Sequence, residues 1–355
     1  MMENRQSFLI IRRDNIGDLV LTTPMLEAIR KRYPEAYIAV LVNSYNAPAI
    51  AGNPFVDDVF SYTKGKHAAG ASILHAHWQR LKLIWRLRQC RFDFVILPNG
   101  GFAARALSFA RLLKPRRIVG FVSGEAPSGL SLPIAHAGGE HLHETEDICR
   151  LLAPLDVTEP IPGLTVVADK ALAARISAGF PATFTQASGP VVALHLSARK
   201  EKQRWPVERF AELAHRLHAA YGVRFLVFWS PGDENNPFHP GDDGKAARLL
   251  IEIADLPVAP VRTEALAELI AGLSLADHAV LSDGGAMHLA AGLGKPLVCF
   301  FGNSPAYRWH PWGVPYRLLQ KPSEDVGDIS VDEACQAYGE LVAAIALAED
   351  TGPEN

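Results

Sequence analysis

Residues 8–29 read FLIIRRDNIGDLVLTTPMLEAI and contain, in order, the three parts of a parallel α/β unit. The apolar run at residues 8–11 predicts a buried strand, and the polar residues 12–18 predict a loop. Apolar residues then recur at helical spacing over residues 21–29, which predicts a helix that begins near Leu19. A strand, a loop and a helix in this order are typical of a parallel sheet covered by helices.

The same alternation continues along the chain. In the first half, further strands are predicted at residues 37–42, 94–97 and 117–121. In the second half, strands are predicted at residues 191–194, 224–229, 258–259, 278–281 and 297–301. Helical patterns separate these runs. The sequence therefore predicts an α/β protein of two Rossmann-like, doubly wound domains that face a central cleft, with ligands at the carboxyl ends of the strands.

The length of 355 residues is typical of about two domains. Proline and glycine are concentrated in residues 156–189, which makes this segment the best candidate for a linker. We place the N-terminal domain at residues 1–170 and the C-terminal domain at residues 171–355. A C-terminal helix is expected, and it is free to pack back on the N-terminal domain.

Composition excludes several classes of protein. Hydrophobic residues make up 48% and charged residues 21%, which argues against a disordered chain or a coiled coil. The net charge of -3 argues against a nucleic-acid partner. The sequence contains neither a signal-peptide pattern nor an apolar run long enough to span a bilayer. Four scattered cysteines argue against a disulfide framework, so we expect a cytoplasmic protein.

Charge is distributed unevenly. Between Phe60 and Gly124 the only acidic residue is Asp93, against twelve basic residues. The basic residues are Lys64, Lys66, Arg80, Lys82, Arg86, Arg88, Arg91, Arg105, Arg111, Lys114, Arg116 and Arg117. This stretch is either a solvated face or a landing surface for an anionic partner, such as a phosphorylated substrate or an acidic membrane surface.

The loop after the first strand contains the first candidate for chemistry. Gly17 permits a tight turn, and Asp18 lies at or near the start of the following helix. Asp18 is then either a helix cap or, at the carboxyl edge of the first strand, a general base.

Two segments of the second half are candidates for an anion site. Residues 196–206 follow a strand and contain Arg199, Lys200, Lys202 and Arg204, which either bind phosphate groups or form a solvated run of charge. Residues 282–291, SDGGAMHLAA, combine two glycines with a helix start, which favours a diphosphate. His288 in this segment is otherwise a core histidine. Neither a dinucleotide-binding fingerprint nor a P-loop is present.

Four motifs, in the same order and over nearly the whole chain, resemble those of glycosyltransferase family 9, the ADP-heptose:lipopolysaccharide heptosyltransferases. They are IRRDNIGDLVLTTP at residues 11–24, RRIVGF at 116–121, RWPVERFAEL at 204–213, and SDGGAMHLAAGLGKP at 282–296 followed by FGNS at 301–304. The resemblance implies a GT-B fold that binds the acceptor on the N-terminal half and the nucleotide sugar on the C-terminal half.

The resemblance also implies an inverting transfer of a heptose or related sugar, with ADP-heptose as the expected donor, to a lipopolysaccharide core. Asp18 would be the catalytic base. The donor would contact Ser197, Lys202, Arg204, Asp242, Asp283, Gly284, Gly285 and His288, with Asp242 on the ribose hydroxyls. The acceptor would contact Arg13, Asn15, Lys64 and Arg105. The alternative function is a nucleotide- or dinucleotide-binding protein, either an oxidoreductase or a non-catalytic module.

One position departs from the family pattern. Family members often carry lysine where this chain has Gln203. The cation that contacts the diphosphate therefore stays open between Lys202 and Arg204.

We expect metal-independent catalysis without a cofactor. Closely spaced carboxylates typically hold a metal in such enzymes, and no Asp-x-Asp occurs in the sequence. The His75/His77 and His141/His143 pairs have metal-like spacing but no evident third ligand, so we interpret them as loop histidines. Peripheral contact with the cytoplasmic face of the inner membrane is a further expectation.

Overall fold

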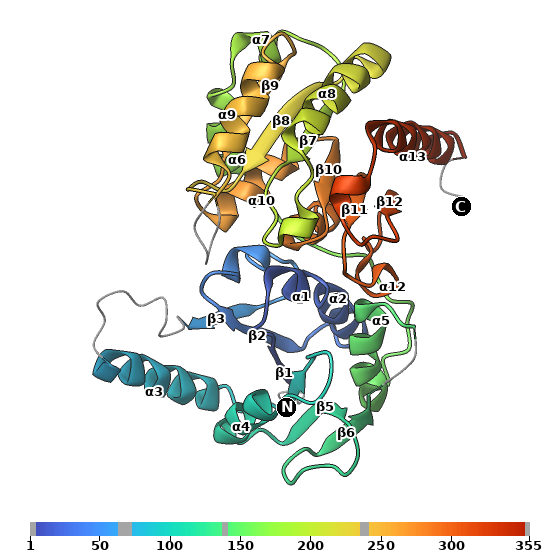
Figure 1. Ribbon diagram of the computed structural model, residues 1–355. Helices are drawn as coiled ribbons and strands as arrows, with labels where there is room; N and C mark the ends of the chain where they lie inside the picture. Colours follow the sequence, from blue (N-terminus) through green and yellow to red (C-terminus); the bar gives the residue numbers. More distant parts are fainter. Residues whose placement is uncertain (1–4, 63–72, 137–140, 235–240, 352–355) are drawn as a thin grey trace. The chain divides into compact units, whose positions relative to one another are not determined.

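The computed structural model describes residues 5–62, 73–136, 141–234 and 241–351 (Figure 1). The contacts divide the chain into two compact units, Met1–Val167 and Ala168–Asn355. This division lies close to the predicted boundary after residue 170. Each unit contains a six-stranded sheet in which all the strand pairs are parallel.

The sheet of the N-terminal unit has the strand order β3-β2-β1-β4-β5-β6. Its strands are β1 (Ser7–Ile11), β2 (Tyr37–Asn43), β3 (Asp58–Tyr62), β4 (Phe94–Leu97), β5 (Arg117–Val122) and β6 (Leu132–Ala135). The central strand β1 is buried along its whole length because helices cover both faces of the sheet. The edge strands β3 and β6 were not predicted, because their partly exposed side chains give no continuous apolar run.

Helices cover the two faces of this sheet. Helices α3 (Ile73–Gln89) and α4 (Ala104–Leu113) share a buried cluster with one face, while α2 (Thr23–Arg32) packs against α5 (Glu144–Cys149). The helix predicted from Leu19 is interrupted, since α1 (Ile16–Val20) ends before α2 begins. Pro24 lies at the start of α2, where it donates no backbone hydrogen bond to α1.

The sheet of the C-terminal unit has the strand order β12-β11-β10-β7-β8-β9. Its strands are β7 (Val191–His195), β8 (Arg224–Trp229), β9 (Val258–Arg262), β10 (His278–Ser282), β11 (Leu297–Phe301) and β12 (Tyr316–Gln320). Counted from its first strand, this order is the same as that of the N-terminal unit. In both sheets, the direction in which successive strands are added therefore reverses beside the first strand. The reversal lies between β1 and β4 in one sheet and between β7 and β10 in the other. Such a switch point is where doubly wound sheets bind ligands.

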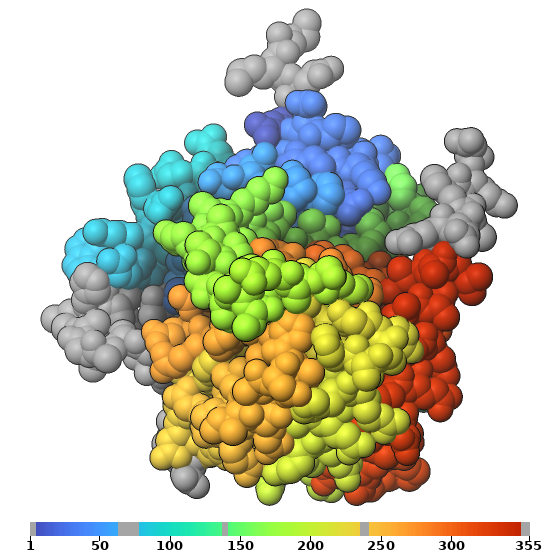
Figure 2. Space-filling view, turned by 90° about the horizontal axis from the view of Figure 1, so that it is seen from above, coloured from blue at the N-terminus to red at the C-terminus, as the bar shows by residue number. Residues whose placement is uncertain are grey.

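The helices of the C-terminal unit also cover both faces of the sheet. Helices α8 (Val207–Tyr221), α9 (Asp243–Glu252) and α13 (Val331–Thr351) contribute to one buried cluster with β7, β8 and β11. Helix α10 (Leu266–Ser274) contacts α6 (Lys170–Ala178) and α11 (Gly285–Gly292). In Figure 2, α8, α9 and α10 form much of the yellow and orange surface of this unit.

The C-terminal helix α13 belongs to the C-terminal unit. It packs against β11, β12 and α8. Its buried side chains, such as Leu341 and Tyr338, are part of the cluster that also contains α8. Packing of this helix on the N-terminal domain stays a prediction.

Candidate functional site

The loop after β1 is organised around a buried arginine. The Nη2 of Arg12 lies 3.0 Å from Oε1 of Glu144 and 3.2 Å from Oδ1 of Asp18. The side chains of Arg12 and Glu144 are 2% and 1% exposed, whereas that of Asp18 is 14% exposed. A buried guanidinium requires such partners because burial removes its hydration. Asp14 lies 3.5 Å from Nε of Arg12 and is 39% exposed, so Asp14 and Asp18 are the members of this network that reach solvent.

The second oxygen of Asp18 is held by the start of α1. Its Oδ2 accepts hydrogen bonds from the backbone N and from Nδ2 of Asn15, at 3.0 and 2.9 Å. Asn15 is the N-cap of α1 and Asp18 the third helical residue, so the two form a capping box. Asp18 is thus not the cap itself. The network fixes its carboxylate in one orientation at the carboxyl end of β1.

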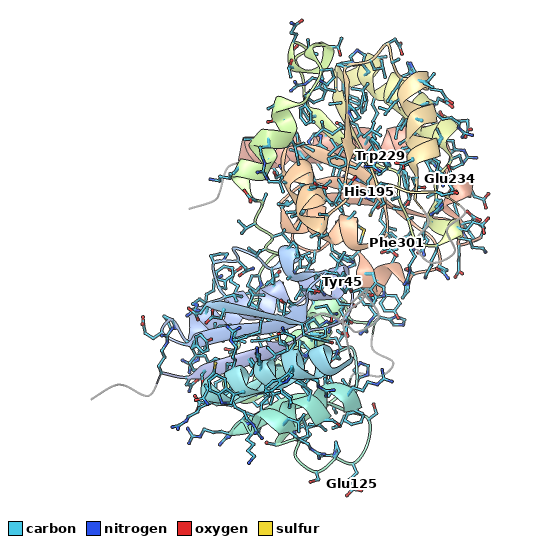
Figure 3. All side chains as sticks on the ribbon, turned by 90° about the vertical axis from the view of Figure 1, so that its left-hand side faces the viewer. Tyr45, Glu125, His195, Trp229, Glu234 and Phe301 are labelled. Atoms are coloured by element: carbon cyan, nitrogen blue, oxygen red, sulfur yellow. The ribbon has the colours of Figure 1, made fainter. Side chains whose placement is uncertain are left out.

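Further polar groups surround the same loop. The Nδ2 of Asn99, just after β4, donates to Oδ2 of Asp14 at 2.7 Å. The hydroxyl of Tyr45, just after β2, donates to the backbone oxygen of Asp14 (Figure 3). Partial burial raises the pKa of Tyr45, and the charges of Asp18 and Asp14 raise it further, so this hydroxyl stays protonated at neutral pH. Three neighbouring strands therefore contribute to the surroundings of Asp14.

The residues predicted to bind the acceptor are placed differently from one another. The Arg13 guanidinium lies over the rings of Phe109 and Tyr62, at 5.0 and 5.5 Å from their centroids. Asn15 contacts Asp18 directly, and Arg105 is exposed in the first turn of α4. Lys64 lies outside the described residues. Contact of these side chains with an acceptor stays a prediction.

In the C-terminal unit, the segments that follow β7 and β10 contact each other. The Nε2 of the buried Gln203 donates to Oδ2 of Asp283 at 3.0 Å, and Nζ of Lys200 donates to Oδ1 of Asn303 at 3.1 Å. A Cβ on Gly302 would lie 3.0 Å from the backbone oxygen of Lys202. A glycine at position 302 therefore allows the segment after β7 to pack closely on the end of β11.

The start of α11 has the properties of an anion site. Gly284 caps this helix with φ 157° and ψ -172°, a conformation that residues with a side chain rarely adopt. A Cβ there would meet no atom within 4 Å, so space is open beside the first turn, which begins at Gly285. Free backbone amides and the helix dipole favour a negative charge at such a position.

The charge of Asp283 depends on its surroundings. Burial raises the pKa of this carboxyl, while a hydrogen bond to Ser304 and the charge of Lys200 lower it.

His288 is buried within α11, in agreement with its interpretation as a core histidine. Contact of His288 with the donor stays a prediction.

Two cations of the C-terminal unit surround a buried carboxylate. Asp242, which precedes α9, is fully buried; its Oδ1 lies 3.2 Å from Nζ of Lys245 and 3.6 Å from Nη1 of Arg204. The Nε of Arg204 donates to the backbone oxygen of Ala198 at 2.8 Å. The Nη2 of Arg204 is buried without a hydrogen-bond partner among the described residues. Lys202, by contrast, is exposed.

This placement changes the interpretation of Asp242. Because the carboxylate of Asp242 is fully buried, it can contact ribose hydroxyls only if the protein groups that cover it move. Its present contacts hold Arg204 and Lys245 in position. The ribose assignment stays a prediction, and the structure favours a positioning role.

His195, which ends β7 beside the switch point, is not among the predicted site residues. Its imidazole is buried, and desolvation lowers the pKa of His195 to about 4, although the charge of Asp242 opposes this shift. His195 and Trp229 end the adjacent strands β7 and β8 (Figure 3). Ser197 lies two residues after His195, and its Oγ accepts a hydrogen bond from the backbone N of Ser230 at 2.8 Å. The sequence signal that could have identified His195 is its position as a histidine at the carboxyl end of a predicted central strand.

The histidine pairs do not form a metal cluster within the described ranges. No group of three His, Cys, Asp or Glu side chains suited to a metal occurs among these residues. His143 is buried and caps α5, where its Nδ1 accepts from the backbone N of Thr145 at 3.2 Å. The side chains of His75 and His77 lie outside the described part. In that part, no helix is long and apolar enough to cross a membrane.

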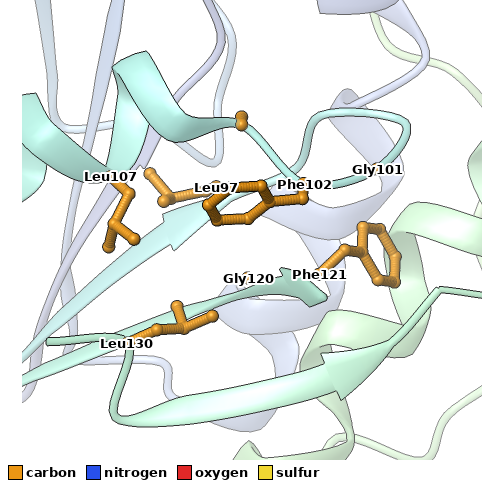
Figure 4. A pocket seen from close by; sticks show the side chains of 8 residues that line it. Leu97, Gly101, Phe102, Leu107, Gly120, Phe121 and Leu130 are labelled. Atoms are coloured by element: carbon orange, nitrogen blue, oxygen red, sulfur yellow. The ribbon is translucent and has the colours of Figure 1, made fainter. Parts of the chain in front are cut away.

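A small pocket of the N-terminal unit differs from a nucleotide site. It lies beside β4, β5 and α4 and is lined by apolar groups, including Leu97, Phe102, Leu107, Phe121 and Leu130 (Figure 4). Because no charged side chain lines it, it offers no partner for a phosphate.

Two parallel six-stranded sheets with the same strand order make up the GT-B class of glycosyltransferase fold, as the sequence analysis predicted. The model of glycosyltransferase family 9 (heptosyltransferase) matches residues 80–330. The chain therefore belongs to this family and is a glycosyltransferase, and the family prediction is confirmed.

Known relatives agree with this assignment. Lipopolysaccharide heptosyltransferase 3 of Escherichia coli K12 is 24% identical over 305 residues, which cover 83% of this chain and 82% of the relative. The crystal structure of a family 9 glycosyltransferase from Veillonella parvula has a TM-score of 0.77 at 17% identity, with 97% and 99% of the chains covered. E. coli heptosyltransferase WaaC with ADP has a TM-score of 0.74 at 18% identity, with 95% and 100% covered.

Proposed function

We propose that this protein transfers a heptose, or a related sugar, from a nucleotide-diphosphate sugar to a lipopolysaccharide core with inversion at the anomeric carbon. The observation that carries the proposal is the fixed carboxylate of Asp18, which Arg12 and Asn15 hold at the carboxyl end of β1. The family match and the lipopolysaccharide heptosyltransferase relative support the choice of sugar and acceptor.

ADP-heptose is the donor that we propose. The solved E. coli relative with ADP supports an adenine nucleotide. In this chain, the open start of α11 and the cations Lys200, Lys202 and Arg204 would bind its diphosphate. Backbone amides and cations stabilise the negative charge that develops on a departing diphosphate.

In the proposed reaction, the acceptor hydroxyl loses its proton to Asp18 while its oxygen forms a bond to the anomeric carbon of the donor. The bond between that carbon and the diphosphate oxygen breaks at the same time, and its electron pair stays with the leaving nucleotide. Attack from the face opposite the leaving group inverts the anomeric centre. Asp18 ends protonated and returns its proton to water.

We further propose that the transfer requires no bound metal ion, because the cations of the C-terminal unit supply the positive charge that the leaving diphosphate needs. Activity should then be unchanged after treatment with EDTA. A loss of activity that Mg²⁺ or Mn²⁺ restores would contradict this part of the proposal.

The acceptor is proposed to bind the N-terminal unit, with Arg13, Asn15, Lys64 and Arg105 as its contacts. A lipopolysaccharide core carries anionic groups, which suits the basic stretch between Phe60 and Gly124. Such an acceptor is anchored in a bilayer, so we also propose that the protein works at the cytoplasmic face of the inner membrane.

The direct test supplies the purified protein with ADP-heptose and a heptose-deficient lipopolysaccharide core. We expect release of ADP, transfer of the sugar and an inverted anomeric linkage by NMR. ADP-glucose, UDP-glucose and NAD serve as alternative ligands. Hydride transfer from NADH, or no transfer from any nucleotide sugar to any core acceptor, would favour the dinucleotide-binding alternative.

A further inference from the structure

Helix α3 of the N-terminal unit has two apolar faces, of which one is packed. Leu83 and Leu87 are buried in the cluster that α3 shares with α4. Trp78, Leu81 and Trp85 are exposed by 64%, 59% and 64%. Their spacing of three and four residues places them along one stripe of the helix, opposite the buried pair. Two tryptophans in one exposed stripe are a costly arrangement for a surface that faces only water.

Cations border this stripe. Lys82, Arg86 and Arg88 are exposed, and α3 contains no acidic residue. The Arg86 guanidinium lies over the ring of Phe60, 5.5 Å from its centroid. The Nε of Arg88 donates to the backbone oxygen of Leu112 at 2.7 Å. These contacts fix two positive charges beside the tryptophans.

The positive charge continues beyond α3. Helix α4 lies beside α3 in Figure 1, and its last turn carries the exposed Leu112. Further exposed cations lie in this turn and just after it. These cations are Arg111, Lys114, Arg116 and Arg117. The single acid of this stretch, Asp93, lies 3.1 Å from Arg116. Most of the positive charge therefore has no acidic counterpart nearby in the sequence.

We propose that the α3 face, defined by Trp78, Leu81, Trp85, Lys82, Arg86 and Arg88, docks on an anionic lipid bilayer. Tryptophan prefers the boundary between lipid headgroups and hydrocarbon, and an amphipathic helix bordered by cations lies in the plane of that boundary. Phospholipid headgroups supply the negative charge that this face lacks. A symmetric pair of α3 faces from two copies of the chain would bring equal positive charges together, which disfavours that occupant.

This proposal rests on the α3 face and does not depend on the identity of the transferred sugar. Vesicle binding is measured without any transfer reaction, so its failure and a failure of the proposed function are distinguishable. Transfer to a soluble core oligosaccharide tests the proposed function alone, without membrane binding.

The experiment measures sedimentation with vesicles of phosphatidylcholine, with and without phosphatidylglycerol. We expect the protein to bind the vesicles that contain phosphatidylglycerol and to bind pure phosphatidylcholine weakly. Trp78→Ser with Trp85→Ser should lower the partition coefficient roughly ten-fold or more, since both rings leave the interface. Lys82→Gln with Arg86→Gln should lower it by about five-fold per charge.

Ile251→Ser is the matched control, because Ile251 is 76% exposed on α9 of the other unit. It should leave vesicle binding unchanged. The tryptophan pair variant should keep its circular dichroism spectrum and its transfer to a soluble acceptor.

A measurement on the unmodified protein removes any dependence on variant folding. Brominated phosphatidylglycerol should quench part of its tryptophan fluorescence, because the two α3 rings insert while Trp205 and Trp229 stay buried in the core. Absence of binding to anionic vesicles would overturn the proposal, as would equal binding of the tryptophan variant. A dimer that dissociates in the tryptophan variant would also overturn it, in favour of a protein interface.

Discussion

The guanidinium of Arg12 lies 3.2 Å from Asp18 and 3.0 Å from Glu144, which is 132 residues away from Arg12 in the chain. Glu144 is buried at the start of α5, so this contact ties the fold of the N-terminal unit to the orientation of Asp18. Glu144 itself is a positioning residue, since it acts on Asp18 through Arg12.

The first prediction concerns this positioning. Glu144→Gln should destabilise the protein by roughly 2–4 kcal/mol, because it leaves a buried guanidinium with less compensating charge. It should also lower kcat, with the donor affinity unchanged. Chemical unfolding and steady-state kinetics measure the two effects.

Glu208→Gln is the control, because Glu208 pairs with Arg248 at 2.6 Å on the exposed surface. Such a pair contributes less than about 1 kcal/mol. Equal stability losses in the two variants, or unchanged kcat in Glu144→Gln, would contradict the positioning role.

The second prediction separates the cations of the C-terminal unit. Lys200→Ala, Lys202→Ala and Arg204→Ala should each weaken ADP binding if the removed charge contacts the diphosphate, by roughly 1.5–3 kcal/mol for a buried charge-assisted bond. Arg204→Ala should in addition lower the melting temperature, since it removes a partner of the buried Asp242. Calorimetric titration with ADP ranks the three. Negligible losses in all three would place the diphosphate elsewhere.

The third prediction uses the strained glycine before α11. Gly284→Ala should destabilise the protein by about 1–3 kcal/mol, the usual cost of a rare backbone conformation. It should also weaken ADP binding, because the new methyl group would occupy the open space at the helix start. Gly101→Ala is the matched control, since Gly101 has φ 139° and equally open surroundings in the other unit. Equal ADP affinity in the two variants would argue against a diphosphate at α11.

The fourth prediction concerns pH. The pKa of His195 is lowered from 6.5 to about 4 by burial, so the unfolded chain binds a proton below pH 6.5 that the folded protein does not. Above pH 6.5, His195 is neutral in both states and does not lower the free energy of unfolding. As pH falls toward 4, the buried neutral imidazole lowers the free energy of unfolding by roughly 2–3 kcal/mol.

His195→Gln should accordingly flatten the loss of stability between pH 6.5 and 4 in urea titrations. The pKa of the partly buried His215 is raised, chiefly by a backbone hydrogen bond to Ala211, so His215→Gln should change the slope in the opposite direction. An unchanged slope in His195→Gln would contradict the burial of a neutral imidazole.

Much of the fold follows from local pattern. The buried strands β1, β7 and β11 are continuous apolar runs, and such runs are visible in the sequence. The edge strands β3 and β6, and the weakly apolar β12, lack this signal because solvent reaches part of their side chains. Their positions are set by pairing with a neighbouring strand.

The site was predictable to the extent that it follows strand ends. Residues 12–18 and 282–288 were found because glycine and polar residues come directly after apolar runs. The contact between Arg12 and Glu144 was not predictable, since it joins distant segments through the tertiary fold. The hydrogen bond from Gln203 to Asp283 was not predictable for the same reason. This bond gives Gln203, which stands where family members often carry lysine, a structural role.

The role of Asp18 as the catalytic base is tested most directly by Asp18→Asn, compared with Asp14→Asn in the same loop. The asparagine oxygen can still accept the hydrogen bonds from Asn15, but an amide cannot take the acceptor proton. Single-turnover transfer from ADP-heptose should therefore fall by roughly 10²–10⁴ in Asp18→Asn. Folding and ADP affinity should be retained, and Asp14→Asn should transfer at a rate much closer to that of the unmodified protein. A folded Asp18→Asn variant that transfers at the normal rate, or a loss confined to Asp14→Asn, would contradict the assignment.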